Sequence, residues 1–277
     1  MKTRIITAIV AILIFVPVLI FSDTVVFPIA FGLLAVVAAW EMLSCVGVRK
    51  NIAVTLLSLL ATAAAMAGAG YLSRTGGTDR FEQLLLTFTY VYLFLMLTFS
   101  VFSKGKLPVS DALTAAGMIF FIVFGFSAVV LLREEPHGGY LYLLIFLSAW
   151  ITDTGAYFTG VFFGKHKLIP DVSPKKTVEG AIGGIFFCVL TFVIFGVIVG
   201  QISDLTPHYL RLALVGAVVS VVSMIGDLIA SLIKRKYGVK DYGKIFPGHG
   251  GVMDRFDSVL ATAPFLFMFA DALHLLS

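Results

Sequence analysis

Residues 181–202 read AIGGIFFCVLTFVIFGVIVGQI and contain no charged side chain. A helix needs roughly 17–25 mostly apolar residues to cross the hydrocarbon core of a bilayer, so this run is long enough to span a membrane. Eight further runs of similar character, bounded by charged residues, occupy most of the remaining chain. The sequence therefore predicts an all-α, polytopic integral membrane protein with about nine transmembrane helices.

The predicted spans end where charged or turn-forming residues begin. The second span is the shortest and contains Pro28, which cannot donate a backbone hydrogen bond inside a helix. In chain order, the nine spans are residues 5–21, 25–40, 52–72, 84–102, 112–132, 140–163, 181–202, 209–233 and 258–276.

The overall composition agrees with a membrane protein and excludes several other classes. Hydrophobic residues make up 59% of the 277 residues, charged residues only 13%, and the mean hydropathy is +1.02. One soluble core cannot bury that much apolar surface, and disordered, collagen-like and coiled-coil chains have different compositions. Cys45 and Cys188 have neither metal-binding nor redox spacing, so we interpret them as packing thiols.

Loop charges indicate the orientation of the chain. With the N-terminus in the cytoplasm, sixteen of the twenty Lys and Arg residues lie on the cytoplasmic side. The four on the outer side are Arg74, Arg80, Arg133 and Arg211. The positive-inside rule thus favours an odd number of spans and a cytoplasmic N-terminus. The expected location is the cytoplasmic (inner) membrane.

The two halves of the chain differ in their polar content. Residues 1–135 have few charges between their loop ends, and we interpret them as N-terminal scaffold helices. Residues 136–277 combine intramembrane carboxylates with two polar loops, 164–180 and 234–257, both on the predicted cytoplasmic side. We therefore expect the catalytic region in this second half.

Two aspartates interrupt predicted spans. Asp153 and Asp227 lie in the cytoplasmic halves of their helices, where a carboxylate costs on the order of 2.5–3.5 kcal/mol on insertion scales. Such residues are usually functional, although a hydrogen bond to a neighbouring helix is an alternative. Asp227 also belongs to a polar stripe along one helix face, formed by Ser223, Asp227, Ser231 and Lys234.

The loop at 234–257 contains the elements of a phosphate and cation site. Gly248, Gly250 and Gly251 allow positive φ angles and a close approach of backbone N–H groups to an anion. Asp254 and Asp257 are three residues apart and offer oxygen ligands for a hard cation. The alternatives are an ordinary juxtamembrane turn for the glycines and a helix N-cap for Asp257.

The loop at 164–180 contains a compact set of phosphate donors. These are the hydroxyls of Ser173 and Thr177 and the ammonium groups of Lys175 and Lys176. Positive-inside anchoring alone would explain the lysines, but not the flanking hydroxyls.

Two blocks of these residues resemble a known family, the phosphatidate cytidylyltransferases (CDP-diacylglycerol synthases). The first block is Ser231-x-Ile233-Lys234-Arg235, Lys240-Asp241-x-Gly243 and Phe246-Pro247-x-His249-Gly250-Gly251-Val252-x-Asp254-Arg255-Phe256-Asp257. The second is Asp153-Thr154-Gly155-Ala156-Tyr157, Gly164-Lys165 and Ser173-Pro174-Lys175-Lys176-Thr177-x-Glu179-Gly180. The resemblance covers roughly residues 150 to 258.

The resemblance implies a magnesium-dependent nucleotidyltransferase of phospholipid biosynthesis. Phosphatidate would attack the α-phosphorus of CTP and release pyrophosphate, giving CDP-diacylglycerol, with the active site facing the cytoplasm. The implied catalytic residues are Asp227, Asp254, Lys234, Arg235 and His249. The implied substrate-binding residues are Ser173, Lys175, Lys176, Thr177, Glu179, Ser231, Lys240, Asp241, Gly250, Gly251 and Arg255.

The expected ligands and partners follow from the same resemblance. Mg²⁺, with room for a second metal ion, would be held by Asp227, Asp254, Asp153 and Asp257. The expected partners are CTP, phosphatidate and the bilayer, with no nucleic acid. Gly-xxx-Gly pairs starting at Gly160, Gly180 and Gly196 allow helices to approach closely, which is compatible with a homodimer.

Other classes fit the residues less well. An intramembrane aspartyl protease would also place two aspartates on separate helices, but Asp153 and Asp227 lack the flanking residues of such enzymes. A proton-coupled transporter is disfavoured because the halves show no inverted repeat. The Asp-x-x-Asp-Gly-x-x-Ala-Arg block of CDP-alcohol phosphotransferases is absent from the sequence. The related alternative is a cytidylyltransferase for another membrane lipid, such as an ether lipid or an isoprenoid phosphate.

Overall fold

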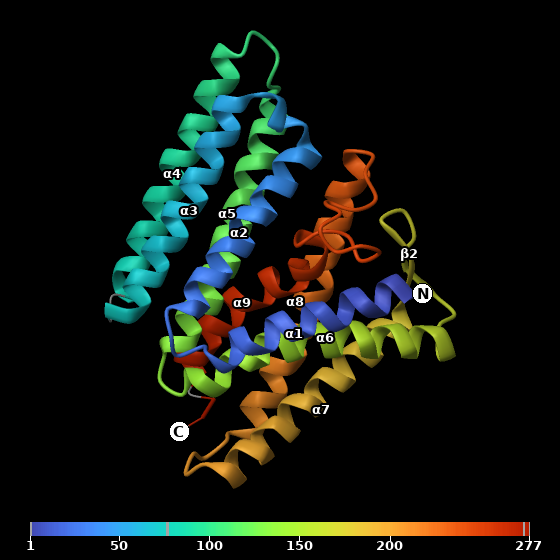
Figure 1. Cartoon of the computed structure of the whole chain (residues 1–277). Coiled ribbons are helices and arrows are strands. Elements are labelled where there is room, and N and C mark those ends of the chain that lie inside the picture. The colour runs from blue at the N-terminus through green and yellow to red at the C-terminus, as the bar shows by residue number, and fades with distance from the viewer. Residues whose placement is uncertain (1, 76–77, 274, 277) are drawn as a thin grey trace. The chain divides into compact units, whose positions relative to one another are not determined.

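The computed structural model describes residues 2–75, 78–273 and 275–276, and within them the chain is almost entirely helical (Figure 1). The described part contains nine α-helices, one for each predicted span, and a short 3-10 turn, η1, at Val48–Lys50. The helices are α1 Lys2–Ile20, α2 Val26–Val46, α3 Ile52–Thr75, α4 Thr78–Phe102, α5 Val109–Glu134, α6 Gly138–Phe163, α7 Val178–Ile202, α8 Tyr209–Lys236 and α9 Met253–Leu273.

The predicted fold class, an all-α polytopic membrane protein, is confirmed. Seven helices in the described residues, α2 to α8, are long and apolar enough to cross a membrane by length and composition. In α1 the apolar part is shorter, Ile9–Ile20. Helix α9 starts five residues before the predicted span, so its first turns carry the charged residues Asp254, Arg255 and Asp257.

The helices group into two compact units. The first unit comprises Met1–Leu131 and Lys236–Phe256, and the second comprises Leu132–Arg235 and Asp257–Ser277. The segment Lys236–Phe256, called the loop segment below, therefore groups with the N-terminal helices, although it lies far from them in sequence.

An aromatic cluster forms the core of the first unit. Phe31 of α2 is fully buried, and its ring centroid lies 5.8 Å from that of Phe126 in α5. Phe126 in turn lies 5.5 Å from Phe256, at the end of the loop segment. Phe15 of α1 contacts both Phe31 and Phe256, at 6.4 and 6.0 Å. Burial of these rings fixes the loop segment against helices α1, α2 and α5.

In the second unit, α6 and α7 lie side by side (Figure 1) and meet through small residues. A methyl group added at Gly180 would stand 2.7 Å from the carbonyl oxygen of Ala156, and one added at Gly184 would stand 3.0 Å from that of Thr152. At Gly183 it would overlap the side chain of Thr159. These glycines are used for packing within one chain, so they give no information on a homodimer.

A β-hairpin occupies most of the polar segment before α7. Strand β1, Lys167–Ile169, pairs antiparallel with β2, Ser173–Thr177. The sequence predicts only a loop at 164–180, because two polar strands of three and five residues lack the apolar alternation that identifies strands. The hairpin holds its lysines in a defined place relative to α6, α7 and α8.

Candidate active site

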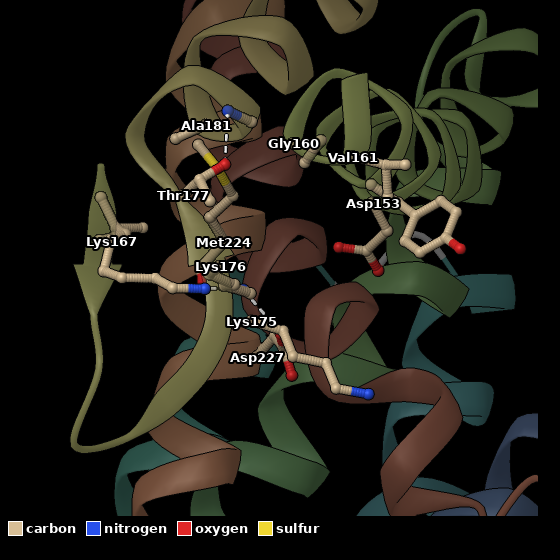
Figure 2. A pocket seen from close by; sticks show the side chains of 14 residues that line it. Asp153, Gly160, Val161, Lys167, Lys175, Lys176, Thr177, Ala181, Met224 and Asp227 are labelled. Atoms are coloured by element: carbon tan, nitrogen blue, oxygen red, sulfur yellow. Dashed lines mark hydrogen bonds and ion pairs between the residues drawn. The ribbon is translucent and has the colours of Figure 1, made fainter. Parts of the chain in front are cut away.

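A cavity of about 450 Å³ lies in the second unit, between the hairpin and helices α6, α7 and α8 (Figure 2). This volume falls within the roughly 300–1,000 Å³ of typical small-molecule sites. Apolar side chains of α6 and α8 line part of it, including Tyr157, Val161 and Met224. The charged residues of its lining are two carboxylates and three lysines: Asp153, Asp227, Lys167, Lys175 and Lys176.

Asp227 and Lys176 form an ion pair inside this cavity. The Nζ atom of Lys176 lies 2.6 Å from Oδ2 of Asp227, and both side chains are largely buried, at 22% and 28% exposure. Lys176 also donates to the carbonyl oxygen of Met224 at 3.4 Å, and Ser231 donates to Oδ1 of Asp227 at 3.5 Å. The intramembrane carboxylate is thus balanced by a lysine of the hairpin, a partner that comes from a β-strand and not from a neighbouring helix.

Two other predicted metal ligands, Asp153 and Asp257, lie in the same unit as Asp227. Asp153 points from α6 toward the cavity (Figure 2). Asp257 of α9 is 7% exposed and lies within electrostatic range of Asp227, Lys234 and Asp153. The N-cap alternative for Asp257 is wrong, because α9 begins at Met253 and Asp257 lies in its second turn.

The carboxylates suit a hard cation that is completed by substrate oxygens. Asp153 and Asp227 face one cavity, and Mg²⁺ is commonly bound through one or two carboxylates together with substrate phosphates. No group of three or more His, Cys, Asp or Glu side chains arranged to hold a metal occurs among the described residues. The two carboxylates that face the cavity suit a metal that binds together with a phosphate-bearing substrate.

Glu179 and Thr177 organise the hairpin from its base. The carboxylate of Glu179 accepts hydrogen bonds from the backbone N–H of Lys165 at 3.1 Å and of His166 at 3.2 Å, and its Oε1 lies 2.7 Å from Nδ1 of His166. Thr177 caps α7 by accepting from the N–H of Gly180 at 3.1 Å. Thr177 lines the cavity, whereas neither Glu179 nor Ser173 is part of its lining.

The polar stripe of α8 leads from a buried seam to the end of the helix. Ser223 is fully buried, and its carbonyl oxygen accepts from Oγ of Ser258 at 3.3 Å. Its own Oγ has no hydrogen-bond partner among the described residues. At the other end of the stripe, Lys234 is half-buried and Arg235 is exposed. Part of the predicted stripe therefore serves packing against α9.

The loop segment of the first unit folds around Asp254. Its Oδ2 accepts from the N–H of Tyr242 at 2.8 Å and of Gly251 at 2.9 Å. A tight turn precedes it, in which Gly248 and Gly250 have φ angles of +78° and +88°. Both angles lie in the region that favours glycine, as the sequence predicts for a loop that presents backbone amides.

The remaining predicted residues of this loop lie on its surface or in the turn. Lys240, Asp241 and Arg255 are exposed. The N–H of His249 donates to the carbonyl oxygen of Phe246 at 2.8 Å, and its ring Nδ1 is buried without a hydrogen-bond partner among the described residues. Asp254 belongs to one unit and Asp227 to the other, so a metal held by both stays a prediction.

One polar residue of this loop's surroundings is missed by the sequence analysis. Glu41, in α2, is 3% exposed and accepts hydrogen bonds from the N–H of Val252 at 3.1 Å and of Met253 at 2.9 Å. The signal in the sequence was an acidic residue directly after the apolar run that ends at Trp40. A charged residue at that place predicts the end of the span, whereas α2 continues to Val46.

Comparison with known proteins places these features in a family. The sequence profile described as "Cytidylyltransferase family" matches residues 2–273. A protein named phosphatidate cytidylyltransferase from Staphylococcus epidermidis is 38% identical over 267 residues, which cover 96% of this chain and 97% of that protein. Proteins of the same name from Staphylococcus haemolyticus and Staphylococcus aureus are 36% and 34% identical over 266 and 272 residues, with the same coverage of each chain.

Proposed function

Because the chain belongs to the cytidylyltransferase family, we propose that it is a phosphatidate cytidylyltransferase that converts CTP and phosphatidate into CDP-diacylglycerol and pyrophosphate. The observation that carries this proposal is the cavity of the second unit, where three lysines and two carboxylates share a lining with apolar side chains. Such a lining suits a substrate with a phosphate head and a hydrocarbon tail.

The apolar part of the lining supports entry of a lipid. Tyr157 and Val161 line the cavity, yet they are 65% and 61% exposed on the surface of α6. On a helix that spans a bilayer, such exposed side chains face hydrocarbon. A phosphatidate molecule can therefore place its phosphate among the lysines while its acyl chains remain in the membrane.

The lysines support the chemistry of phosphoryl transfer. Lys167, Lys175 and Lys176 line the cavity, and their ammonium groups would bind and orient the phosphate of the lipid. One of its oxygens forms a bond to the α-phosphorus of CTP, while the bond from that phosphorus to the β-phosphate oxygen breaks and pyrophosphate leaves. No strong base is needed, because a phosphate monoester is already largely ionised near neutral pH.

The carboxylates support a metal requirement. Asp153 and Asp227, which line one cavity, would hold Mg²⁺ together with substrate phosphates, while Asp254, Asp257 and a second metal ion stay predictions of the family resemblance. When bound, the ion neutralises phosphate charge and holds the reacting groups in line. Lys176 would then release Asp227 and turn its ammonium to a phosphate oxygen.

The loop segment supports binding of the nucleotide. The positive-φ turn at Gly248–Gly250 and the exposed side chains of Lys240 and Arg255 suit the phosphates of CTP. The family resemblance implies a catalytic role for His249, Lys234 and Arg235, and substrate binding by Asp241 and Gly251. Ser231 would act through Asp227, and Ser173 and Glu179 through the fold of the hairpin.

The chain is a multi-pass membrane protein, and we propose that its active site faces the cytoplasm. The excess of Lys and Arg in the loops on the predicted inner side supports this orientation. CTP is a cytoplasmic nucleotide, so the hairpin and the loop segment would meet it directly. A homodimer is compatible with the sequence, and the oligomeric state in detergent would test it.

A direct assay tests the proposed function. Detergent-purified protein is incubated with CTP labelled in its α-phosphate, phosphatidate and Mg²⁺, and label in the lipid extract is measured. We expect lipid label that requires both phosphatidate and the divalent ion. Undiminished transfer in excess EDTA, or no labelled lipid with any divalent ion, would contradict the proposal.

A further inference from the structure

Glu41 is a buried carboxylate in the half of the chain that was predicted to be scaffold. A carboxylate that is 3% exposed within an apolar helix is costly unless polar groups compensate it. Its Oε1 accepts from the N–H of Val252 and its Oε2 from the N–H of Met253, the first residue of α9. Both oxygens are thus used by one short backbone segment more than two hundred residues away.

The segment presents three consecutive backbone N–H groups to two carboxylates. Gly251 donates to Asp254 at 2.9 Å, and the next two residues, Val252 and Met253, donate to Glu41. Donors at the start of a helix have no partner within that helix, and negative charge is favourable there. Glu41 therefore fixes the point at which the loop ends, α9 begins and the side chain of Asp254 takes its position.

Two glycines of the loop fit closely around the same carboxylate. A methyl group added at Gly243 would overlap the carboxylate of Glu41 and stand 3.1 Å from its Cγ atom. A methyl group added at Gly251 would overlap both carboxylate oxygens. Neither glycine has a positive φ angle, so the close approach to Glu41, and not backbone conformation, explains why glycine fits here.

We propose that Glu41 is a positioning residue for the cytidylyl transfer. It holds residues 240–256 of the loop segment in the conformation that presents Asp254 and the glycine turn to the nucleotide and its metal. This inference rests on the proposed function for its catalytic meaning. The contacts that carry it all lie within the first unit and do not depend on that function.

Glu41→Gln tests the inference with almost no change in volume. One carboxylate oxygen becomes an NH₂ group, which places a donor against a backbone donor and loses one hydrogen bond. Glu82→Gln is the matched control, because Glu82 is an exposed glutamate of α4. The full-length protein in detergent is used in both measurements.

The first measurement is limited trypsin digestion, which does not depend on cytidylyl transfer by the protein. Lys240, Lys244 and Arg255 are exposed sites within the loop, and Lys106 is an exposed site outside it. We expect Glu41→Gln to speed cleavage at the loop sites about fivefold or more, with cleavage at Lys106 unchanged. Unchanged loop cleavage, or equal acceleration at Lys106, would overturn the inference, since the latter indicates general destabilisation.

The second measurement separates the kinetic constants. We expect Glu41→Gln to raise the Mg²⁺ concentration for half-maximal turnover and the KM for CTP about tenfold, and to leave the KM for phosphatidate unchanged. A proportional loss in all constants would overturn the positioning role. If the loop opens in the trypsin assay while the wild-type protein transfers no cytidylyl group, the proposed function has failed and the structural part of the inference stands.

A second pair of variants keeps the test valid if Glu41→Gln folds poorly. Gly243→Ala pushes a methyl group against the carboxylate of Glu41 and should open the loop in the same way. In the double variant with Glu41→Ala the overlap is removed, so the loop should be cleaved no faster than in Glu41→Ala alone. Additive effects of the two substitutions on cleavage would overturn the inference.

Discussion

The ammonium group of Lys176 lies 2.6 Å from Oδ2 of Asp227, so a cation of the protein itself occupies the carboxylate that is proposed to bind a metal ion. The pair is largely shielded from water, which strengthens its attraction. Binding of a metal together with a nucleotide would then be an exchange, in which Lys176 gives up a carboxylate and gains a phosphate.

Lys176→Met should change metal binding and turnover in opposite directions. Without the competing ammonium group, we expect the affinity of the free protein for Mg²⁺ to rise several-fold, while turnover of CTP falls by about two orders of magnitude. Titration with Mn²⁺ followed by electron paramagnetic resonance measures the first effect. Lys106→Met, at an exposed loop position, is the control. Weaker metal binding by Lys176→Met would contradict the exchange.

Asp227→Asn and Asp254→Asn should each lower turnover by orders of magnitude while the protein still folds. The substitution keeps the size of the side chain but removes the charge that a cation requires. In Asp254→Asn, the amide oxygen can still accept from Tyr242 and Gly251, so the loop should remain resistant to trypsin. Asp204→Asn, at an exposed position between α7 and α8, should leave turnover unchanged. Wild-type rates at limiting Mg²⁺ in either variant would argue against the metal site.

Gly183→Leu should loosen the packing of α6 against α7. Any side chain at position 183 meets Thr159 directly, and overpacking of this kind typically costs about 1–3 kcal/mol. We expect a lower melting temperature in detergent, measured by intrinsic fluorescence. Gly117→Leu is the control, since a methyl group added there meets nothing within 4 Å apart from the adjacent residues and backbone of its own helix. Equal melting temperatures for the two variants would contradict the close packing of α6 against α7.

The orientation can be tested with single cysteines in a protein that lacks Cys45 and Cys188. Asp171→Cys in the hairpin turn and Lys244→Cys in the loop segment are exposed positions, and Asp204→Cys lies between α7 and α8. In sealed cells, a membrane-impermeant thiol reagent should label only the cysteine at 204. Labelling at 171 or 244 from outside would reverse the proposed topology and move the site to the outer face.

The helices could be predicted because the length of an apolar run is a local property, whereas several helix ends could not. Helix α9 begins at Met253, five residues before the predicted start, because Glu41 supplies the acceptors for its first N–H groups. Helix α2 continues past Trp40 because the charge of Glu41 is compensated by these hydrogen bonds within the fold. A single sequence does not show partners that are more than two hundred residues apart.

The site could be predicted by residue type, and less well by the role of each residue. The sequence predicts Lys176 as a phosphate donor and Asp227 as an intramembrane carboxylate for separate reasons, and the structure brings them into contact. The family resemblance predicts that Glu179 and Ser173 bind substrate, yet they lie outside the lining of the cavity. Their placement depends on the hairpin, whose short polar strands gave no periodic signal.

The fit of Gly243 and Gly251 around Glu41 also limits how this protein can be recombined. A chimaera that takes its first helices from one relative and its last loop from another would have to match the acidic residue with both glycines at once. Crossovers between residues 41 and 243 are expected to succeed only when both parents carry all three. The segment that contains Glu41 and the segment that contains Gly243 and Gly251 are therefore expected to be exchangeable together and not one at a time.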